Sequence, residues 1–315
     1  MTGVAAFDCG TNSLRLLVAN IDVRAGSSDD LVREMRVVRL GQGVDRTGRI
    51  ADASLQRVFS AVEDYMEMVR EHEVREIRFC ATSAARDAEN SEAFLAGIRE
   101  RTGVQPEVLD GDAEARLSFA GATRSLPPLP EPLLVVDIGG GSTELILGDA
   151  DAGISAQESL DIGSVRLNER HLAGDPPSRD EIAAAVADID EALDECSVDP
   201  AQAGAVIGVA GTVTTIAAAV LDLARYDRTV IHHSVLRADA VQGAVTRLLS
   251  MMVEQRKELP YMHPGRADVI GAGGLILDRI LRRTTVKSML VSEHDILDGI
   301  AWSLASAATQ TDEKS

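Results

Sequence analysis

The sequence has 315 residues, longer than one typical domain and shorter than three, so it predicts two domains or one large α/β unit. Hydrophobic residues make up 45% of the chain and charged residues 26%, which is typical of a folded globular protein and excludes a disordered one. With 31 basic and 50 acidic residues the net charge is −19. This charge argues against nucleic acid or an anionic membrane as a partner, because both need a basic surface.

The sequence also indicates a compartment. There is no apolar run of about 18 residues and no signal-peptide pattern at the N-terminus, so we expect a cytoplasmic protein. The cysteines Cys9, Cys80 and Cys196 lie far apart and in no CxxC pair. This spacing predicts reduced thiols rather than disulfides or a structural zinc site.

Hydrophobic periodicity predicts strands and helices that alternate along the chain. In the first part these are a hairpin over 5–21, a strand over 31–40, a helix over 54–69, a strand over 76–81, a helix from 91, and a helix capped by Asp110 or Asp112. The proline-rich segment 127–132 predicts a domain boundary or a stiff connection. Beyond it we expect a strand over 206–209, helices from 212, over 238–258 and over 266–283, a strand over 286–291 and a helix from 295. Alternation of this kind predicts α/β sheets covered by helices.

One short motif occurs twice, about half a chain apart. Aligned without gaps, DCGTNSLRLLV (8–18) and DIGGGSTELIL (137–147) share Asp, Gly, Ser and Leu at the same positions. Each copy predicts a strand ending in Asp, a turn, and a second strand. Such turns point backbone N–H groups outward as an anion-binding nest, and glycine lets a phosphate approach the backbone. The phosphate-binding candidates are Gly10, Thr11, Asn12, Ser13, Gly139, Gly140, Gly141 and Ser142.

The alternative is that Asp and Gly serve only hairpin turn chemistry, which a single copy favours and two matched copies disfavour. Asp8 and Asp137 are candidate metal ligands, because a carboxylate repels phosphate unless Mg²⁺ bridges the two. The copies differ where Arg15 stands in the place of Glu144. Glu144 adds a second carboxylate on the Asp137 side and favours the metal there, whereas Arg15 either holds a phosphate or pairs structurally.

Seven motifs carry a resemblance to a known family: FDCGTNSLRLL, TSAARDAEN, GDAEARLSF, VVDIGGGSTEL, DIGSVRL, GVAGTVTT and VIGAGGLIL. In this order and spacing, over about residues 4–305, they closely resemble the exopolyphosphatase and guanosine-pentaphosphate phosphohydrolase (Ppx/GppA) family. Three further stretches, LGQGVDRTGR, HPGRADVIGAGG and SEHDILDGIA, look most like its short actinobacterial branch. The family belongs to the superfamily of actin and the sugar kinases (ASKHA).

The resemblance implies an α/β fold of two ribonuclease-H-like domains that face each other across a cleft. The first would span residues 1–125 and the second 126–305. A C-terminal helix over about 296–310 could pack back on the first domain, and residues 309–315 would form a flexible tail. A homodimer is also expected, since a dimer groove could replace the additional C-terminal domain of longer family members.

The resemblance further implies an enzyme that releases the terminal phosphate of inorganic polyphosphate with Mg²⁺ or Mn²⁺. The nearest alternative substrate is guanosine pentaphosphate, with guanosine tetraphosphate as a related ligand. A non-catalytic sensor of polyphosphate or alarmone stays open. An ATP-dependent kinase is disfavoured, because DAEARL and SEHDILDGIA do not resemble kinase signatures. No nucleic acid or membrane is expected as a partner.

Carried over by position, the catalytic carboxylate of the family falls on Glu114, which would orient the attacking water, and its phosphate-binding arginine falls on Arg86. Its metal-side acids fall on Asp137 and Glu144. Further candidates match positions that contact phosphate or line the nucleotide region: Gly208, Gly211, Thr212 and, as a weaker match, Arg166. Thr212 could instead be a helix N-cap. We do not predict metal binding by His232 and His233, because adjacent side chains diverge on a helix or strand.

Overall fold

The computed structural model describes residues 1–312 and consists of two compact units. The first unit contains residues 1–121 and the segment from Ile296 onward, and the second contains residues 122–295. The predicted division at 125/126 lies four residues after the observed one. The second unit ends at Asp295, ten residues before the predicted 305, because the helix that follows packs on the first sheet.

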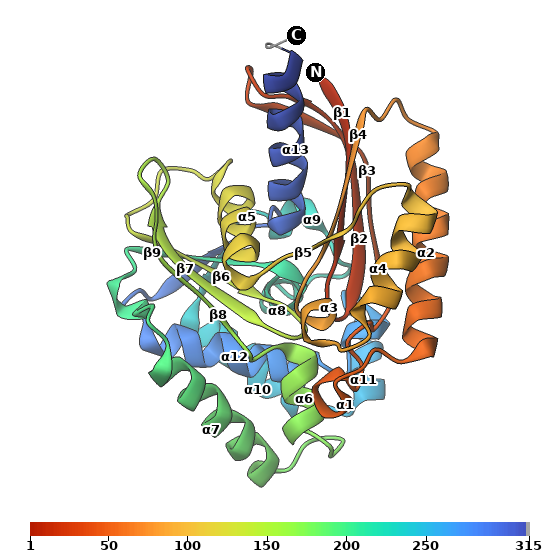
Figure 1. Ribbon diagram of the computed structural model, residues 1–315. Coiled ribbons are helices and arrows are strands. Elements are labelled where there is room, and N and C mark those ends of the chain that lie inside the picture. The colour runs from red at the N-terminus through yellow and green to blue at the C-terminus, as the bar shows by residue number, and fades with distance from the viewer. Residues whose placement is uncertain (313–315) are drawn as a thin grey trace. The chain divides into compact units, whose positions relative to one another are not determined.

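The first unit is built on a five-stranded sheet in the order β3-β2-β1-β4-β5 (Figure 1). The first three strands form an antiparallel meander, and β4 and β5 are parallel to β1. The strands are β1 (Thr2–Cys9), β2 (Ser13–Asp22), β3 (Ser27–Val37), β4 (Glu76–Ala81) and β5 (Glu107–Val108). The helices are α1 (Val44–Thr47), α2 (Asp52–Arg70), α3 (Ser83–Asp87), α4 (Ser91–Thr102), α5 (Gly111–Thr123) and α13 (Ile296–Asp312).

Helices cover both faces of this sheet because successive strand side chains point to opposite faces. Ala5 and Phe7 of β1 point to the face that α2 and α4 cover, and their cluster includes Val58 of α2. Val4 and Ala6 point to the opposite face, where α13 packs with Ile300 and Ala305. Figure 1 shows α13 running along β1 on the side away from α2. The N-terminal strand and the C-terminal helix therefore share one core.

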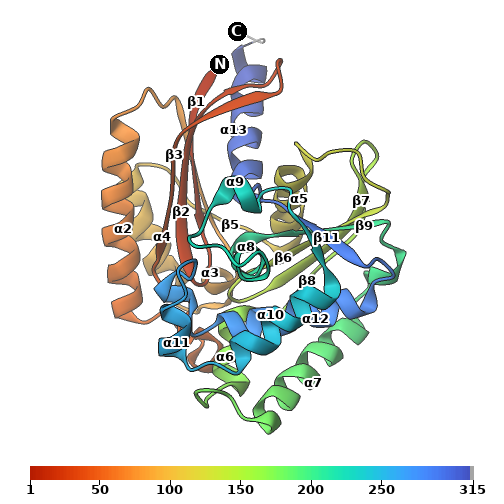
Figure 2. The same cartoon turned by 180° about the vertical axis from the view of Figure 1, so that it is seen from behind.

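The second unit is built on a six-stranded sheet in the order β10-β11-β9-β6-β7-β8. The strands are β6 (Leu133–Ile138), β7 (Thr143–Asp149), β8 (Gly153–Leu160), β9 (Ala205–Val209), β10 (Val235–Arg237) and β11 (Ser288–Val291). The helices are α6 (Ser164–His171), α7 (Arg179–Glu195), α8 (Ala210–Val220), α9 (Arg228–Ile231), α10 (Ala238–Leu249), α11 (Val253–Lys257) and α12 (Ile270–Arg283). Two 3₁₀ turns, Pro200–Gln202 and Pro264–Arg266, complete the unit. Its core includes residues of α8, α10 and α12, the last two side by side in Figure 2.

The two sheets repeat one arrangement. In each, a meander of three antiparallel strands is extended from its first strand by a parallel strand: β3-β2-β1-β4 in the first unit and β8-β7-β6-β9 in the second. The repeated motif occupies the first hairpin of both meanders. The structure thus confirms the predicted fold class of two related α/β domains.

Three predicted elements differ in detail. The single helix predicted over 238–258 is two helices, because α10 ends at Leu249 and α11 begins only at Val253. The helix predicted from residue 266 starts at Ile270, after a 3₁₀ turn. In the predicted tail, residues 309–312 continue α13, and Thr309 Oγ1 donates to Ala305 O within that helix at 2.9 Å. Residues 313–315 lie outside the described part of the chain.

Over residues 1–312 no helix combines the length and the apolar character that a membrane crossing requires.

Candidate functional site: two matched hairpin turns and an Arg–Glu pair

The two copies of the motif form the same turn. Gly10 N donates to Ser13 O at 2.9 Å in the first copy, and Gly139 N donates to Ser142 O at 3.0 Å in the second. A Cβ at Gly139 would lie 3.2 Å from Ser142 O, so the tight turn favours glycine there. The predicted strand, turn and strand are therefore confirmed in both units.

In the first turn, the carbonyl groups are held by the segment that follows β3. Asn12 O accepts hydrogen bonds from the N–H groups of Val38 and Arg39, at 2.9 and 2.8 Å, and Thr11 O accepts from Gly41 N at 2.8 Å. Gly41 is packed closely here, because a Cβ would lie 2.3 Å from Thr11 Cγ2. The Thr11 hydroxyl lies 2.8 Å from the buried Ser83 hydroxyl and so ties the turn to α3.

In the second turn, α6 holds the carbonyl groups in the same way. Gly139 O accepts from Ser164 N at 3.0 Å, and Gly140 O accepts from the N–H groups of Val165 and Arg166 at 2.8 and 3.1 Å. A Cβ at Gly163 would lie 2.4 Å from Gly140 O, so only glycine allows α6 to start this close to the turn.

The first N–H group of each turn, at Gly10 and at Gly139, is used to close the turn. Within the described residues, the backbone N–H groups of Thr11, Gly140 and Gly141 donate no hydrogen bond. Successive N–H groups that are available in a turn form a concave site for an anion. This geometry is what the sequence predicts for a phosphate-binding turn.

The Asp residues of the two motifs have different partners. Asp8 and Arg15 are directly opposite in β1 and β2, and Asp8 Oδ2 accepts from Nε and Nη2 of Arg15 at 2.8 and 2.6 Å. Of the two roles open for Arg15, the structure shows the pairing. A guanidinium therefore already neutralises the Asp8 carboxylate, which the sequence offers as a metal ligand.

In the second copy two carboxylates occupy the same pair of positions. Asp137 and Glu144 are directly opposite in β6 and β7, and both are buried, at 6% and 1% exposure. Directly opposite side chains lie on the same face of a sheet, with Cβ atoms about 5 Å apart. Ser159 of β8 donates to Glu144 Oε1 at 2.8 Å. Two adjacent buried carboxylates form a strongly negative spot that a hard divalent cation would neutralise.

Glu114 and Arg86 meet within the first unit. Asp110 caps α5, since its Oδ1 accepts from Ala113 N at 2.7 Å, so Glu114 lies in the first helical turn. Arg86, in the last turn of α3, donates from Nη1 to Glu114 Oε2 at 3.2 Å and to Leu109 O at 2.9 Å. Glu114 is 7% exposed. The Thr11–Ser83 contact and the Arg86–Glu114 contact both run through α3, so α3 connects the first turn to Glu114.

The other predicted glycines are packed against neighbouring side chains. A Cβ at Gly208 would lie 2.2 Å from Met289 Cε, and Gly208 O accepts from Ser292 N, which gives Gly208 a packing role in β9. A Cβ at Gly211 would lie 2.3 Å from Arg266 Nη2, so the Arg266 guanidinium rests on the first turn of α8. Thr212 is not the N-cap of α8, which is Val209; Thr212 is buried and packs against α12 at Gly273.

His232 and His233 do not diverge as predicted, because His233 has a φ of 63° and its ring stacks on that of His232 with centroids 3.7 Å apart. The pKa of His233 is lowered, mainly by burial and to a smaller extent by the nearby His294. Across residues 1–312, no group of three or more His, Cys, Asp or Glu side chains is arranged to hold a metal ion.

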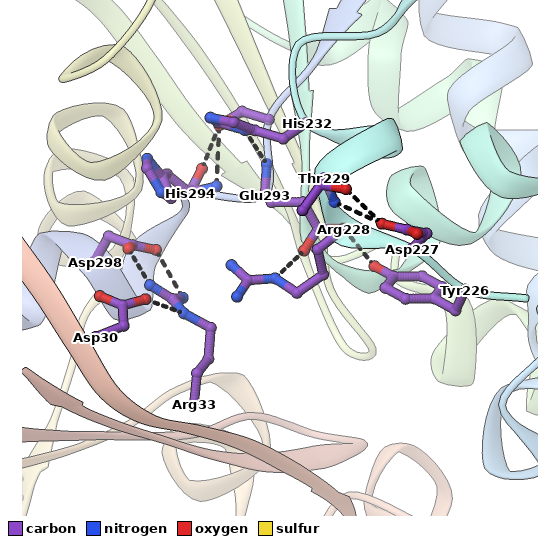
Figure 3. A network of polar contacts seen from close by, with 11 residues as sticks. Asp30, Arg33, Tyr226, Asp227, Arg228, Thr229, His232, Glu293, His294 and Asp298 are labelled. Atoms are coloured by element: carbon purple, nitrogen blue, oxygen red, sulfur yellow. Dashed lines mark hydrogen bonds and ion pairs between the residues drawn. The ribbon is translucent and has the colours of Figure 1, made fainter.

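Figure 3 shows the hydrogen bonds around these histidines. Glu293 accepts from Tyr226 Oη at 2.6 Å and from Arg228 Nε at 3.0 Å, while its own N–H donates to His232 Nδ1 at 3.1 Å. The same figure shows Arg33 donating to Asp30 and Asp298 in the first unit.

Sequence reasoning missed several residues that shape the turns. Gly41 and Gly163 carry no chemical group, and Ser83 and Ser159 are ordinary polar residues in their motifs. Each of them contacts a residue of a hairpin that is distant in the sequence. Ser83 lies 72 residues from Thr11, and Ser159 lies 15 residues from Glu144. Each Gly follows the third strand of its meander, and this shared position is a signal that a comparison of the two halves could have found.

The fold and the paired turns define the class: an α/β protein of two related units, each with a glycine-containing turn of the anion-binding type. The chain belongs to the Ppx/GppA phosphatase family, whose sequence profile matches residues 18–307.

Similar proteins support this assignment. Exopolyphosphatase 2 of Mycobacterium tuberculosis is 43% identical over 97% of this chain and 99% of its own length. A crystal structure of an exopolyphosphatase-like protein has a TM-score of 0.92 and 43% identity, covering 96% of this chain and 97% of the other. An exopolyphosphatase structure from Cytophaga hutchinsonii has a TM-score of 0.88 and 25% identity, covering 97% and 98%.

Proposed function

We propose that the protein is an exopolyphosphatase, which hydrolyses the terminal phosphate of inorganic polyphosphate and releases orthophosphate. The observation that carries this proposal is the pair of matched turns, each with its carbonyl groups engaged on one side and N–H groups available on the other. A chain of phosphates offers repeated anionic groups, which suits two such turns better than one. The 43% identity to an exopolyphosphatase over nearly the whole chain supports the same substrate.

Glu114 is the residue we propose to orient the attacking water. Phosphoryl transfer depends mainly on alignment and charge neutralisation, so a carboxylate need only accept a hydrogen bond from water and aim it. Glu114 Oε2 accepts from Arg86, which fixes the direction of the carboxylate. Arg86 would also bind a phosphate oxygen, since its guanidinium has five N–H donors and the contacts with Glu114 and Leu109 involve one nitrogen.

A divalent cation, Mg²⁺ or Mn²⁺, is part of the proposal, and Asp137 and Glu144 would hold it. The residues fit this group, because Mg²⁺ is commonly bound by one or two carboxylates together with water and substrate phosphate. When bound, the cation would supply neutralisation of the phosphate charge. Asp8 fits less well, since Arg15 already donates two hydrogen bonds to one of its oxygens.

Guanosine pentaphosphate is the second candidate substrate, because its terminal 5′-phosphate would bind the same turns. The family is named for both activities. A non-catalytic sensor of polyphosphate or alarmone is the third candidate, and the Arg86–Glu114 pair argues against it. We further propose a cytoplasmic homodimer, which light scattering would test by finding twice the monomer mass.

The deciding experiment compares orthophosphate release from long-chain polyphosphate and from guanosine pentaphosphate, with Mg²⁺, for the wild type and Glu114→Gln. Faster release from polyphosphate together with an inactive variant supports the proposal. Faster release from the nucleotide makes the protein an alarmone phosphohydrolase. Binding of either compound without release of phosphate makes it a sensor.

A further inference from the structure

We propose that Arg166 is a positioning residue for the second phosphate turn: its guanidinium fixes the Gly141 peptide so that the turn's N–H groups face the phosphate. The inference rests on the proposed function, since it assigns the turn to phosphate. Arg166 itself does not contact substrate in this assignment.

Arg166 makes two hydrogen bonds to the second turn. Its Nε donates to Gly141 O at 2.7 Å, and its backbone N–H donates to Gly140 O at 3.1 Å. One residue thus holds two consecutive carbonyl groups. A peptide is planar, so fixing a carbonyl group on one side directs the N–H of the next residue to the other side. Fixing the carbonyls of Gly140 and Gly141 therefore directs the N–H groups of Gly141 and Ser142.

The guanidinium of Arg166 is largely buried and also pairs with a carboxylate at the surface. Its Nη2 lies 3.6 Å from Asp161 Oδ1, and its side chain is 11% exposed. The Nε of the guanidinium is therefore held against the turn, where it can donate to Gly141 O.

The first turn shows why the second needs such a residue. There the carbonyl groups of Thr11 and Asn12 accept hydrogen bonds from the backbone N–H groups of Val38, Arg39 and Gly41. The second turn has three glycines in sequence, Gly139, Gly140 and Gly141, which have more backbone freedom than the Gly-Thr-Asn of the first. Arg166 restricts one of these peptides through its bond to Gly141 O.

Two substitutions separate the hydrogen bond from the charge. In Arg166→Gln, Nε2 lies as many bonds from the backbone as the Nε of arginine, so a neutral N–H donor remains available to Gly141 O. In Arg166→Met, a side chain of similar length has no donor. Arg170→Met is the matched control, because Arg170 lies one turn further along α6 and pairs with Asp188 at 3.4 Å instead of contacting the turn.

We would measure tripolyphosphate binding by calorimetry, orthophosphate release, and hydrogen exchange of residues 139–145. Arg166→Met should weaken tripolyphosphate binding by up to about tenfold, the upper end of the usual range for a lost hydrogen bond, and raise KM more than it lowers kcat. Its exchange in residues 139–145 should rise, while the midpoint of thermal unfolding stays close to that of Arg170→Met. Arg166→Gln should recover most of the binding.

Unchanged binding in Arg166→Met would overturn the proposal. Equal losses in Arg166→Gln and Arg166→Met would also overturn it, because the charge rather than the donor would then matter. Failure of the proposed function looks different: the wild type would release no orthophosphate, while the variants would still differ in tripolyphosphate binding and in exchange.

Discussion

Asp137 and Glu144 lie directly opposite each other on β6 and β7, in the same register as Asp8 and Arg15 on β1 and β2. One hairpin therefore carries two carboxylates where the other carries an ion pair. The turn has the same backbone hydrogen bond in both halves of the protein. The side-chain pair beside it differs: it has one acid and one base in the first half, and two acids in the second. This difference is the reason why we propose the cation in the second unit.

Metal dependence should follow this asymmetry. Asp137→Asn or Glu144→Gln should raise the Mg²⁺ concentration for half-maximal orthophosphate release by about tenfold or more, because each removes one of two anionic ligands. Asp8→Asn should change that concentration much less. Titration of Mg²⁺ after chelation with EDTA measures it, and an equal shift in all three variants would contradict the assignment.

Glu114→Gln should lower the rate of orthophosphate release by at least about 100-fold, the usual size of a general-base contribution. Glu107→Gln is the control, because Glu107 is also paired with an arginine, Arg78, but is exposed on β5. Steady-state release assays on both variants test the difference. Activity of Glu114→Gln within about threefold of the wild type would remove Glu114 from the water-positioning role.

Arg15→Met should destabilise the fold by about 3 kcal/mol, because it leaves the buried Asp8 carboxylate without the guanidinium that neutralises it. The control is Arg49→Met, since the Arg49–Glu89 pair is exposed on both sides and should contribute less than about 1 kcal/mol. Urea unfolding gives both values. If both variants lost less than about 1 kcal/mol of unfolding free energy, the Arg15–Asp8 pair would not be needed for stability.

Gly163→Ala should disturb the second turn, because a Cβ would lie 2.4 Å from Gly140 O and 2.5 Å from Gly141 C. Neither is a flexible side-chain end, so the turn itself must move, and we expect a rise in KM for polyphosphate of at least about tenfold. Gly243→Ala, in the interior of α10 with nothing within 4 Å of its Cβ, should leave KM unchanged. A normal KM for Gly163→Ala would mean that the turn tolerates the shift.

Thiol reactivity should follow burial. Burial and then the Asp8 charge raise the pKa of Cys9 well above its usual value, burial raises that of Cys80 to about 12, and burial raises that of Cys196 to about 11. At pH 8 the partly exposed Cys196 should react with a maleimide before the two buried cysteines do. In a time course of labelling, Cys196→Ser should therefore remove the fastest phase.

The same raised pKa values should make the free energy of unfolding fall at alkaline pH. The pKa values of these thiols are higher in the folded than in the unfolded chain, so their contribution is fully present below the unfolded pKa and is lost as the pH rises toward the folded values. Unfolding free energy should therefore fall above about pH 9, and Cys9→Ala should reduce the slope. A slope that does not change in Cys9→Ala would contradict the raised pKa of Cys9.

Local patterns allowed much of this molecule to be predicted. The hairpin turns, the capping of α5 by Asp110 and the strand Glu76–Ala81 each depend on a few consecutive residues. The break between α10 and α11 could not be predicted, because no Gly or Pro marks it. The buried Arg256, seven residues after the end of α10, donates to Leu248 O and Met251 O there, and periodicity does not indicate that this side chain turns back on the helix end.

The candidate site was predictable to a similar extent. Repetition of the motif identified both turns, but the pairing of Arg15 with Asp8 needed the strand register. The packing of Gly208 on Met289 could not be inferred, because the two residues are 81 positions apart and on neighbouring strands. Sequence therefore identified which residues lie near the turns, and the structure showed which side chains and backbone groups they contact.

Because α13 covers one face of the first sheet, the order of synthesis matters for folding. When the ribosome has completed β1 to β5, Val4, Ala6 and Leu17 still lack the helix that buries them, and that helix is made after the whole second unit. The nascent first unit must keep an apolar face exposed for most of translation. A chaperone that binds such faces would meet this chain at an early stage, and release would await residues 296–312.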